Sequence, residues 1–214
     1  MTVIIQSGTH YTKEQLIEPL QELIFTGFQA KFTHRFFTND EATLIAKALS
    51  YFLSSEKPSS LLIAEKNGKI CGCLYMISKS DQSKLLNHYL RQPFSLSKQV
   101  RMWLLLGFLS HVPKDNELHI DFIAVSPVFR GLGIGRQLIT CCKELCDKDY
   151  LTLHVATSNQ NACHLYFSEN FETTKQLSSS IGQTMTGIKD WYFMRWEKTK
   201  KAVLCTEPSF IDTI

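Results

Sequence analysis

The sequence predicts an α/β fold in which a central mixed β-sheet is flanked by helices and a helical insertion separates the third and fourth strands. Three observations support this. Strand-length apolar runs alternate with helical patterns in the second half, which indicates a parallel component in the sheet. The first half contains a strong hairpin signal. The chain has 214 residues, 44% of them apolar and 20% charged, which is ordinary for a globular protein.

The first half predicts a short strand, two helices and a hairpin. Apolar residues spaced three and four apart predict the helices. Thr38 followed by Glu41 forms a capping-box pattern at the start of the second helix. Asn67-Gly68 lies between two apolar runs, which is typical of a tight hairpin. The expected elements are a strand at 3–5, helices at 13–28 and 38–53, and strands at 61–65 and 70–77.

The second half begins with the insertion, residues 80–114, which is interrupted at Pro93 and contains a helical run over 97–110. Later elements are expected at 118–125 (strand), 134–148 (helix), 151–155 (strand), 159–168 (helix), and 171–177 and 191–196 (strands). We expect one domain over residues 1–197 and a C-terminal tail over 198–214, which has no apolar period.

Composition excludes several classes of protein. A net charge of +3 is too small to indicate nucleic acid as a partner. The longest apolar run, residues 102–109, is too short to span a membrane. The N-terminal residues lack the pattern of a secretory signal, and the seven cysteines are scattered without a CxxC pair. We therefore expect a cytoplasmic protein without disulfides and with no membrane partner.

The most informative stretch is residues 125–136, VSPVFRGLGIGR, between a predicted strand and a predicted helix. Three alternating glycines allow successive backbone N–H groups to converge on an anion, and the helix N-terminus adds its positive end. Arg130 and Arg136 flank the turn and are suited to phosphate. The stretch lacks the Lys-Ser or Lys-Thr of a P-loop, and Arg136 stands where GxGxxG requires a glycine. The alternative is a glycine-rich connection without a ligand.

Residues 130–135, RGLGIG, resemble the (Gln/Arg)xxGx(Gly/Ala) acyl-CoA pyrophosphate motif of the GNAT N-acetyltransferases, and residues 122–127 resemble the strand that precedes it. A second segment agrees with that family's downstream pattern through Leu153-His154-Val155, Asn159, Ala162, Leu165-Tyr166 and Phe171. Asn170 replaces the usual glycine, and asparagine tolerates the positive φ expected after a helix. The resemblance implies acetyl-CoA as co-substrate and direct attack by an amine in a ternary complex.

The resemblance also implies roles for individual residues. Tyr166 would protonate the leaving thiolate, or else it packs between helix and sheet. The base would be His119 first and Asp121 second, or these residues only form a charged edge of the groove. A period of two places Glu117, His119, Asp121 and Ile123 on one face, with Glu117 solvated. The resemblance implies that the backbone of Ile123, Ala124 and Val125 binds the pantetheine arm of acetyl-CoA, with the Ile123 N–H as oxyanion donor. The residues implied for the phosphates are Arg130, Gly131, Leu132, Gly133, Ile134, Gly135 and Arg136. Asn159 would bind a pantetheine amide, or it is the N-cap of the following helix, or it does both.

No metal is expected, because Cys142, Cys146, His154 and His164 lack the spacing of a zinc site. The predicted function is N-acetylation of a primary amine on an unidentified small molecule or peptide. The alternatives are a catalytically silent acyl-CoA-binding or regulatory module and, less well supported, a nucleotide-binding protein. Residues 80–114 and 32–37 are expected to form the acceptor-side wall. Residues 102–109 are alternatively a dimer contact, so the chain is expected to be a monomer or a homodimer.

Overall fold

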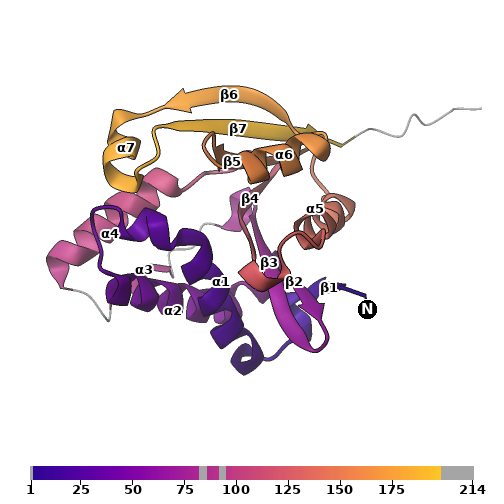
Figure 1. Cartoon of the computed structure of the whole chain (residues 1–214), viewed down its shortest axis with the longest axis horizontal. Helices are drawn as coiled ribbons and strands as arrows, with labels where there is room; N and C mark the ends of the chain where they lie inside the picture. Colours follow the sequence, from indigo (N-terminus) through magenta and orange to yellow (C-terminus); the bar gives the residue numbers. More distant parts are fainter. Residues whose placement is uncertain (1, 82–85, 92–94, 199–214) are drawn as a thin grey trace, which may run out of the picture.

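The computed structural model describes residues 2–81, 86–91 and 95–198, whose strands form one seven-stranded sheet with helices on both faces (Figure 1). The strand order is β1-β2-β3-β4-β5-β7-β6. Neighbouring strands are antiparallel except β4 and β5, which are parallel, so the predicted mixed sheet is confirmed. The strands are β1 Ile4–Ser7, β2 Leu61–Lys66, β3 Lys69–Ile77, β4 Glu117–Val125, β5 Tyr150–Ala156, β6 Glu172–Ser178 and β7 Asp190–Glu197.

The helices are α1 Lys13–Thr33, α2 Asn39–Glu56, α3 Leu86–Arg91, α4 Leu96–Leu109, α5 Ile134–Leu145, α6 Gln160–Ser168 and α7 Ser180–Thr186. The predicted capping box is confirmed, because Thr38 accepts from Glu41 N and the Glu41 side chain accepts from Thr38 N. Helix α7 was not predicted. It has seven residues, which is too short for an apolar period, and it begins where Ser179 accepts a hydrogen bond from Gly182 N. No helix of the described part of the chain is long and apolar enough to cross a membrane.

Two turns adopt the backbone conformations expected from the sequence. Asn67 and Gly68 have φ of 55° and 73° in the hairpin between β2 and β3, as the favoured two-residue turn requires. Asn170 has φ of 58° directly after α6, so the position usually held by glycine keeps its left-handed geometry. The tail from residue 199 onward and Pro93 lie outside the described residues.

Apolar side chains cover both faces of the sheet. On one face, α5 and α6 pack against the strands through residues such as Leu138, Cys142 and Tyr166. On the other face, α1 and α2 pack through residues such as Leu20 and Phe52. A third cluster joins α4 and α7 to α1 and α2 through buried side chains including Phe32, Ile45, Met102, Leu105 and Met185. The insertion between β3 and β4 is therefore confirmed in position, and its helix α4 forms part of the hydrophobic core.

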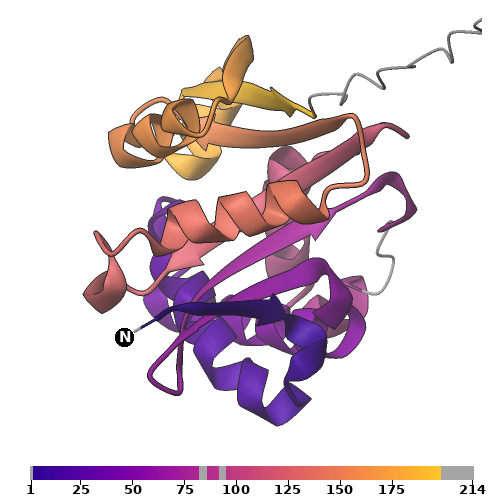
Figure 2. The ribbon, with the colours of Figure 1, turned by 90° about the vertical axis from the view of Figure 1, so that its right-hand side faces the viewer.

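The two parallel strands part before their ends. The ladder between β4 and β5 runs from Glu117–Tyr150 to Ile120–Leu153 and stops there. Beyond this point β4 pairs with β3 alone and β5 pairs with β7 alone. Figure 2 shows α5 lying across the sheet between the part formed by β1 to β4 and the part formed by β5 to β7. Because Ser126 N donates to Cys71 O, strand alternation turns the N–H groups of Ile123 and Val125 away from β3, toward the side where the ladder has ended.

Strand β4 also contains a bulge. Tyr75 of β3 pairs with Phe122, whereas the next residue, Met76, pairs with Ile120. Asp121 is therefore the extra residue, without a partner on β3. A bulge reverses the in–out alternation of all residues that follow it.

The bulge makes one expectation wrong. Ile123 does not share a face with Glu117, His119 and Asp121. It packs with the α5–α6 cluster, whereas Phe122 lies with the α1–α2 cluster. The period of two holds up to Asp121, and the inserted residue then moves Ile123 to the opposite face.

Candidate active site

A cavity of about 450 Å³ lies on the α1–α2 side of the sheet, bounded by α1, α4 and strands β4, β5 and β7. Its wall is mostly apolar, and residues of the insertion such as Trp103 and Leu106 line it, as does Phe32. Phe37 is not among the lining residues and is buried in the third core cluster instead. Among the described residues, the acidic, basic and histidine side chains that line the cavity are Lys31, Lys79, His111, His119, Asp121 and His154.

Asp121 presents its carboxyl group to this cavity. Its side chain is exposed to the solvent in the cavity, although protein surrounds the site. Desolvation raises the pKa of Asp121 to about 6, and the positive charge of Lys31 acts in the opposite direction. Asp121 reaches the cavity through the same strand alternation as His119, and the bulge leaves it without a partner on β3.

Lys31 supplies the cavity with a half-buried cation. Its Nζ lies 4.7 Å from the ring centre of Phe28 and 5.2 Å from that of Trp191, within cation–π range. Burial lowers the pKa of Lys31 to about 8, and the charge of Asp121 opposes this shift. The cavity thus holds a carboxyl group and an amine whose pKa values are both displaced toward neutrality.

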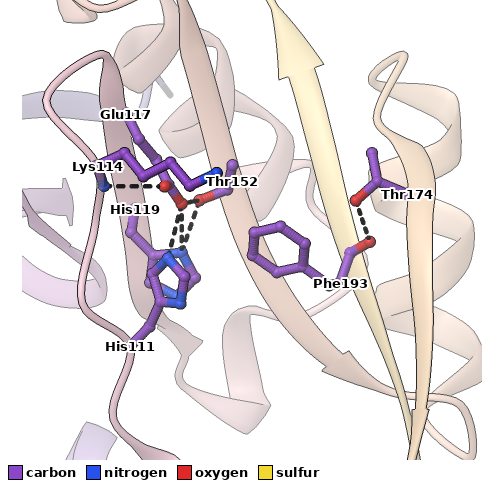
Figure 3. Close-up of polar contacts among 7 residues, drawn as sticks. All are labelled: His111, Lys114, Glu117, His119, Thr152, Thr174 and Phe193. Atoms are coloured by element: carbon purple, nitrogen blue, oxygen red, sulfur yellow. Dashed lines mark hydrogen bonds and ion pairs between the residues drawn. The ribbon is translucent and has the colours of Figure 1, made fainter.

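Glu117 is buried beneath the cavity and is the centre of a hydrogen-bond network (Figure 3). Its carboxylate accepts from His111 Nε2 at 2.7 Å, from Thr152 Oγ1 at 2.5 Å and from Lys114 N at 3.1 Å. Burial raises the pKa of Glu117, but these hydrogen bonds outweigh it and bring the pKa to about 2. The expectation that Glu117 is solvated is wrong, because donors from the insertion and from β5, which strand periodicity does not reveal, surround it.

His119 is 2% exposed, and its Nδ1 lies 2.7 Å from Thr152 Oγ1. The only hydroxyl proton of Thr152 is donated to Glu117, so His119 Nδ1 must donate its own proton to Thr152, and Nε2 keeps a lone pair. Desolvation, together with the neighbouring His111 and His154, lowers the pKa of His119 well below its ordinary value. Burial and a low pKa make His119 less accessible to a proton donor in the cavity than Asp121, which is exposed.

Three histidines come together at the cavity wall. One nitrogen of each of His111, His119 and His154 lies within 4.8 Å of the others. The Phe193 ring packs against them, with its centre 4.8 Å from that of His154. His154 faces the cavity from β5, where it alternates with buried leucines, so strand alternation could have identified it. His111 follows α4 in the insertion and carries no such signal.

The four residues considered for zinc from the sequence are not one group. Cys142 is buried in the α5–α6 cluster, on the face of the sheet opposite the cavity that His154 lines, and Cys146 belongs to the same cluster. Burial raises the pKa of both thiols. His164 is exposed on α6.

The glycine turn leads directly into α5. Gly131 and Gly133 have φ of 77° and 75°, and Gly133 is the N-cap of the helix. The first helical bond runs from Gln137 N to Gly133 O, so the amides of residues 134–136 point out of the helix start without an intrahelical acceptor. Gly135 serves packing instead, because a Cβ there would lie 3.2 Å from Leu165 of α6. Two glycines thus shape the turn, and the third permits close contact between helices.

The two arginines beside the turn have protein partners. Arg136 donates to Ser168 Oγ at 2.9 Å and pairs with Glu169 at 3.2 Å, near the end of α6. Arg130 Nε donates to the Val125 carbonyl at 3.2 Å, which holds Arg130 next to the end of β4. A role for either guanidinium at phosphate stays a prediction, and Arg130 is the one held at the strand end.

Tyr166 and Asn159 lie on α6 and at its start. Tyr166 is 5% exposed, packs against Phe171 with ring centres 5.9 Å apart, and shares its core cluster with Ile123. It does not line the cavity, and burial raises the pKa of its hydroxyl. Asn159 is confirmed as the N-cap of α6, because its Oδ1 accepts from Ala162 N at 3.2 Å.

A family model and a protein relative match parts of this chain. The model of the acetyltransferase (GNAT) family matches residues 18–168. An uncharacterized protein of Mycobacterium leprae is 38% identical over 64 residues, an alignment that covers 30% of this chain and 18% of that protein. The matched segment is therefore a small part of that relative.

Solved acetyltransferases share the fold. An N-acetyltransferase of Staphylococcus aureus Mu50 has a TM-score of 0.64 at 16% identity, covering 90% of this chain and 100% of its own. The yncA protein of Salmonella typhimurium, solved with its cofactor acetyl-CoA, has a TM-score of 0.56 at 16% identity, covering 94% and 98%. At this identity the likeness establishes the fold.

Proposed function

The chain belongs to the GNAT acetyltransferase family, and on that basis we propose that it transfers the acetyl group of acetyl-CoA to a primary amine by direct attack in a ternary complex. The observation that carries the proposal is the position of the glycine turn. It follows β4 after one 3-10 turn at Pro127–Phe129, at the end where β4 has parted from β5, and it opens α5 with outward-facing amides. A phosphate group at the turn and an extended pantetheine arm along the free edge of β4 match these two features.

The free edge of β4 supplies backbone groups for the arm. The N–H groups of Ile123 and Val125 point toward the side where β5 has left the ladder. The amide carbonyls of the pantetheine arm would accept hydrogen bonds from these N–H groups, as the carbonyls of an added β-strand do. The Ile123 N–H is then the donor that polarises the thioester carbonyl.

In the proposed reaction, the acceptor nitrogen forms a bond to the thioester carbon and the carbon–sulfur bond breaks. Asp121, open to the cavity, takes the proton that the ammonium group must lose. Tyr166, whose burial keeps its hydroxyl protonated, gives a proton to the departing thiolate. The products are an N-acetyl amine and CoA, and no covalent enzyme intermediate is formed.

The acceptor enters from the cavity. Its largely apolar wall, which includes Phe28, Trp103 and Trp191, suits an amine carried on an apolar or aromatic body. Lys31, held between two of these rings, is positioned for an anionic or carbonyl group of the same acceptor. The insertion, through α3 and α4, shapes this pocket and thereby selects the acceptor.

A cytoplasmic location and a single domain over residues 1–197 are part of the proposal. Cys71, Cys73, Cys141, Cys142, Cys146 and Cys163, the cysteines of the described ranges, are free thiols, which suits a reducing compartment.

Ligand binding tests the cofactor assignment. Acetyl-CoA and CoA are expected to raise the melting temperature, whereas NAD and ATP leave it unchanged at the same concentration. A shift with ATP or NAD equal to that with acetyl-CoA would contradict the proposal and support a general nucleotide site.

A further inference from the structure

The histidines at the cavity wall form a cluster whose geometry is set by one buried acid. His111, His119 and His154 come from the end of the insertion, from β4 and from β5, and a nitrogen of each lies within 4.8 Å of the others. The ring centre of His154 lies 5.3 Å from that of His111 and 5.3 Å from that of His119, and the ring centres of His111 and His119 lie 4.2 Å apart. Imidazoles that share a tetrahedral zinc ion have ring centres about 5 Å apart, given zinc–nitrogen distances of about 2.0–2.1 Å.

Hydrogen bonds occupy one nitrogen of each of two rings. The Glu117 carboxylate oxygens accept from Thr152 Oγ1 and from Lys114 N, and His111 Nε2 is the third donor to this group, which leaves His111 Nδ1 as the ring nitrogen not bonded to Glu117. Thr152 donates to Glu117 and accepts from His119 Nδ1, leaving a lone pair on His119 Nε2. One carboxylate therefore orients two rings, directly in one case and through a hydroxyl in the other (Figure 3).

This arrangement is the one that surrounds metal-bound histidines. Such a histidine donates its second ring nitrogen to a carboxylate or another acceptor, which sets the tautomer and raises the basicity of the ligating nitrogen. We propose that His111, His119 and His154 bind a divalent transition-metal cation of the Zn²⁺ class, with Glu117 and Thr152 as the positioning residues behind two of the ligands. Imidazole ligands select zinc, cobalt, nickel and copper over calcium and magnesium.

The site has three protein ligands and one open side. All three histidines line the cavity, so a tetrahedral ion there would keep its fourth position open to water or to a lone pair of a cavity ligand. Two nitrogens bound to the same tetrahedral zinc ion are roughly 3.3 Å apart. The histidine nitrogens of this cluster lie within 4.8 Å of one another, so the side chains must rotate to bring them to that separation when an ion binds. The inference is independent of acetyl transfer, since it concerns binding of the ion alone.

Cobalt titration of the chelator-treated full chain tests this site. Co²⁺ is expected to bind once per chain and to produce the visible d–d bands of a four- or five-coordinate ion with nitrogen ligands, and one equivalent of Zn²⁺ should remove them. His154→Ala and His111→Ala should each weaken Co²⁺ binding about 100-fold or more, and Glu117→Gln by about 10–100-fold. His164→Ala changes an exposed histidine outside the cluster and should leave the bands unchanged.

Three results would overturn the proposal. The first is the absence of d–d bands in the folded wild-type chain. The second is retention of full-strength bands in His154→Ala. The third is a thiolate-to-cobalt charge-transfer band in place of the nitrogen-ligand spectrum, which would assign the ion to cysteine. Circular dichroism of each variant establishes that it is folded. Because His154 is only half-buried, we expect His154→Ala to fold, and this variant alone tests the site if His111→Ala does not fold.

Discussion

Asp121 and Phe122 are consecutive residues of β4, and both line the same cavity. In a regular strand their side chains would point to opposite faces. The bulge opposite Tyr75 and Met76 removes that alternation and places an acid beside an aromatic ring at the cavity wall. The aromatic neighbour of the proposed base therefore depends on a single inserted residue in the strand.

Asp121→Asn tests the base. The amide keeps the size of the side chain and removes its ability to accept a proton, so single-turnover acetyl transfer should slow about 10²–10⁴-fold. Acetyl-CoA affinity, measured by calorimetry, should stay within about threefold. Asp115→Asn changes an exposed acid near the insertion and should have no effect on either quantity. A rate for Asp121→Asn within about threefold of wild type would remove Asp121 from proton transfer.

Gly133→Asp tests the phosphate site. The new carboxylate would stand at the N-cap of α5 and repel phosphate. Wild type at a 100-fold excess of acetyl-CoA over its Kd should gain about 2.7 kcal/mol. For a chain of this size that equals a rise in melting temperature of roughly 5–10 °C. Gly133→Asp should lose this rise.

Gly68→Asp is the matched control for that variant. Gly68 has φ of 73°, close to the 75° of Gly133, but it lies in the hairpin between β2 and β3. Both substitutions place aspartate in left-handed backbone and should carry a similar conformational penalty. Gly68→Asp should keep the full acetyl-CoA shift, and a full shift in Gly133→Asp as well would place the phosphates elsewhere.

Tyr166→Phe tests the proposed acid. The ring and its contact with Phe171 are kept, and only the hydroxyl is lost. The rate of thiolate release should fall about 10²–10⁴-fold, with acetyl-CoA binding unchanged. Tyr192→Phe, a half-buried tyrosine of β7, is the control. If both variants retain wild-type single-turnover rates, Tyr166 has the packing role that its burial in the core cluster also explains.

Lys31→Met tests the cost of the cavity cation to stability. The pKa of Lys31 is about 8 in the folded chain against an ordinary 10.5. Between these values the unfolded chain binds more protons, so this residue makes wild-type stability rise with pH from about 8 to 10.5. Below pH 8 the full penalty applies. Lys31→Met should therefore be more stable than wild type at pH 7, by on the order of 1 kcal/mol.

That advantage should shrink above pH 8 and disappear as the pH rises past 10.5, where the lysine becomes neutral in the unfolded chain as well. Urea unfolding of wild type and variant at several pH values measures the difference directly. Lys47→Met, at an exposed lysine of α2, should show no such dependence. A constant difference across this range would mean that Lys31 is not desolvated in the fold.

Much of the fold follows from local sequence signals. Helical spacing, the capping box at Thr38 and Glu41, and the Asn67-Gly68 turn depend on near neighbours, and the structure has each of them. Helix α7 was missed because seven residues are too few for a period. The bulge was missed because it arises from the pairing of β4 with β3, which β4 alone does not encode.

The site was only partly predictable for the same reason. The glycine turn is contiguous in sequence, so its backbone role could be deduced from residues 131–135. The environment of Glu117 depends on His111, which is six residues away in an irregular segment, and on Thr152, which is 35 residues away on the parallel strand. Arg136 was expected beside phosphate, and its pairing with Glu169 depends on how α5 meets the end of α6.

The most direct test of the proposed activity measures CoA release and acetylated product together, with acetyl-CoA and a panel of primary amines. The panel includes amines on aromatic and apolar bodies, lysine-containing peptides and peptide N-termini. We predict that at least one amine increases CoA release, that one N-acetyl product forms for each CoA, and that Asp121→Asn suppresses both. CoA release that no amine increases, in a chain that binds acetyl-CoA at the glycine turn, would contradict the account and identify a silent acyl-CoA-binding module.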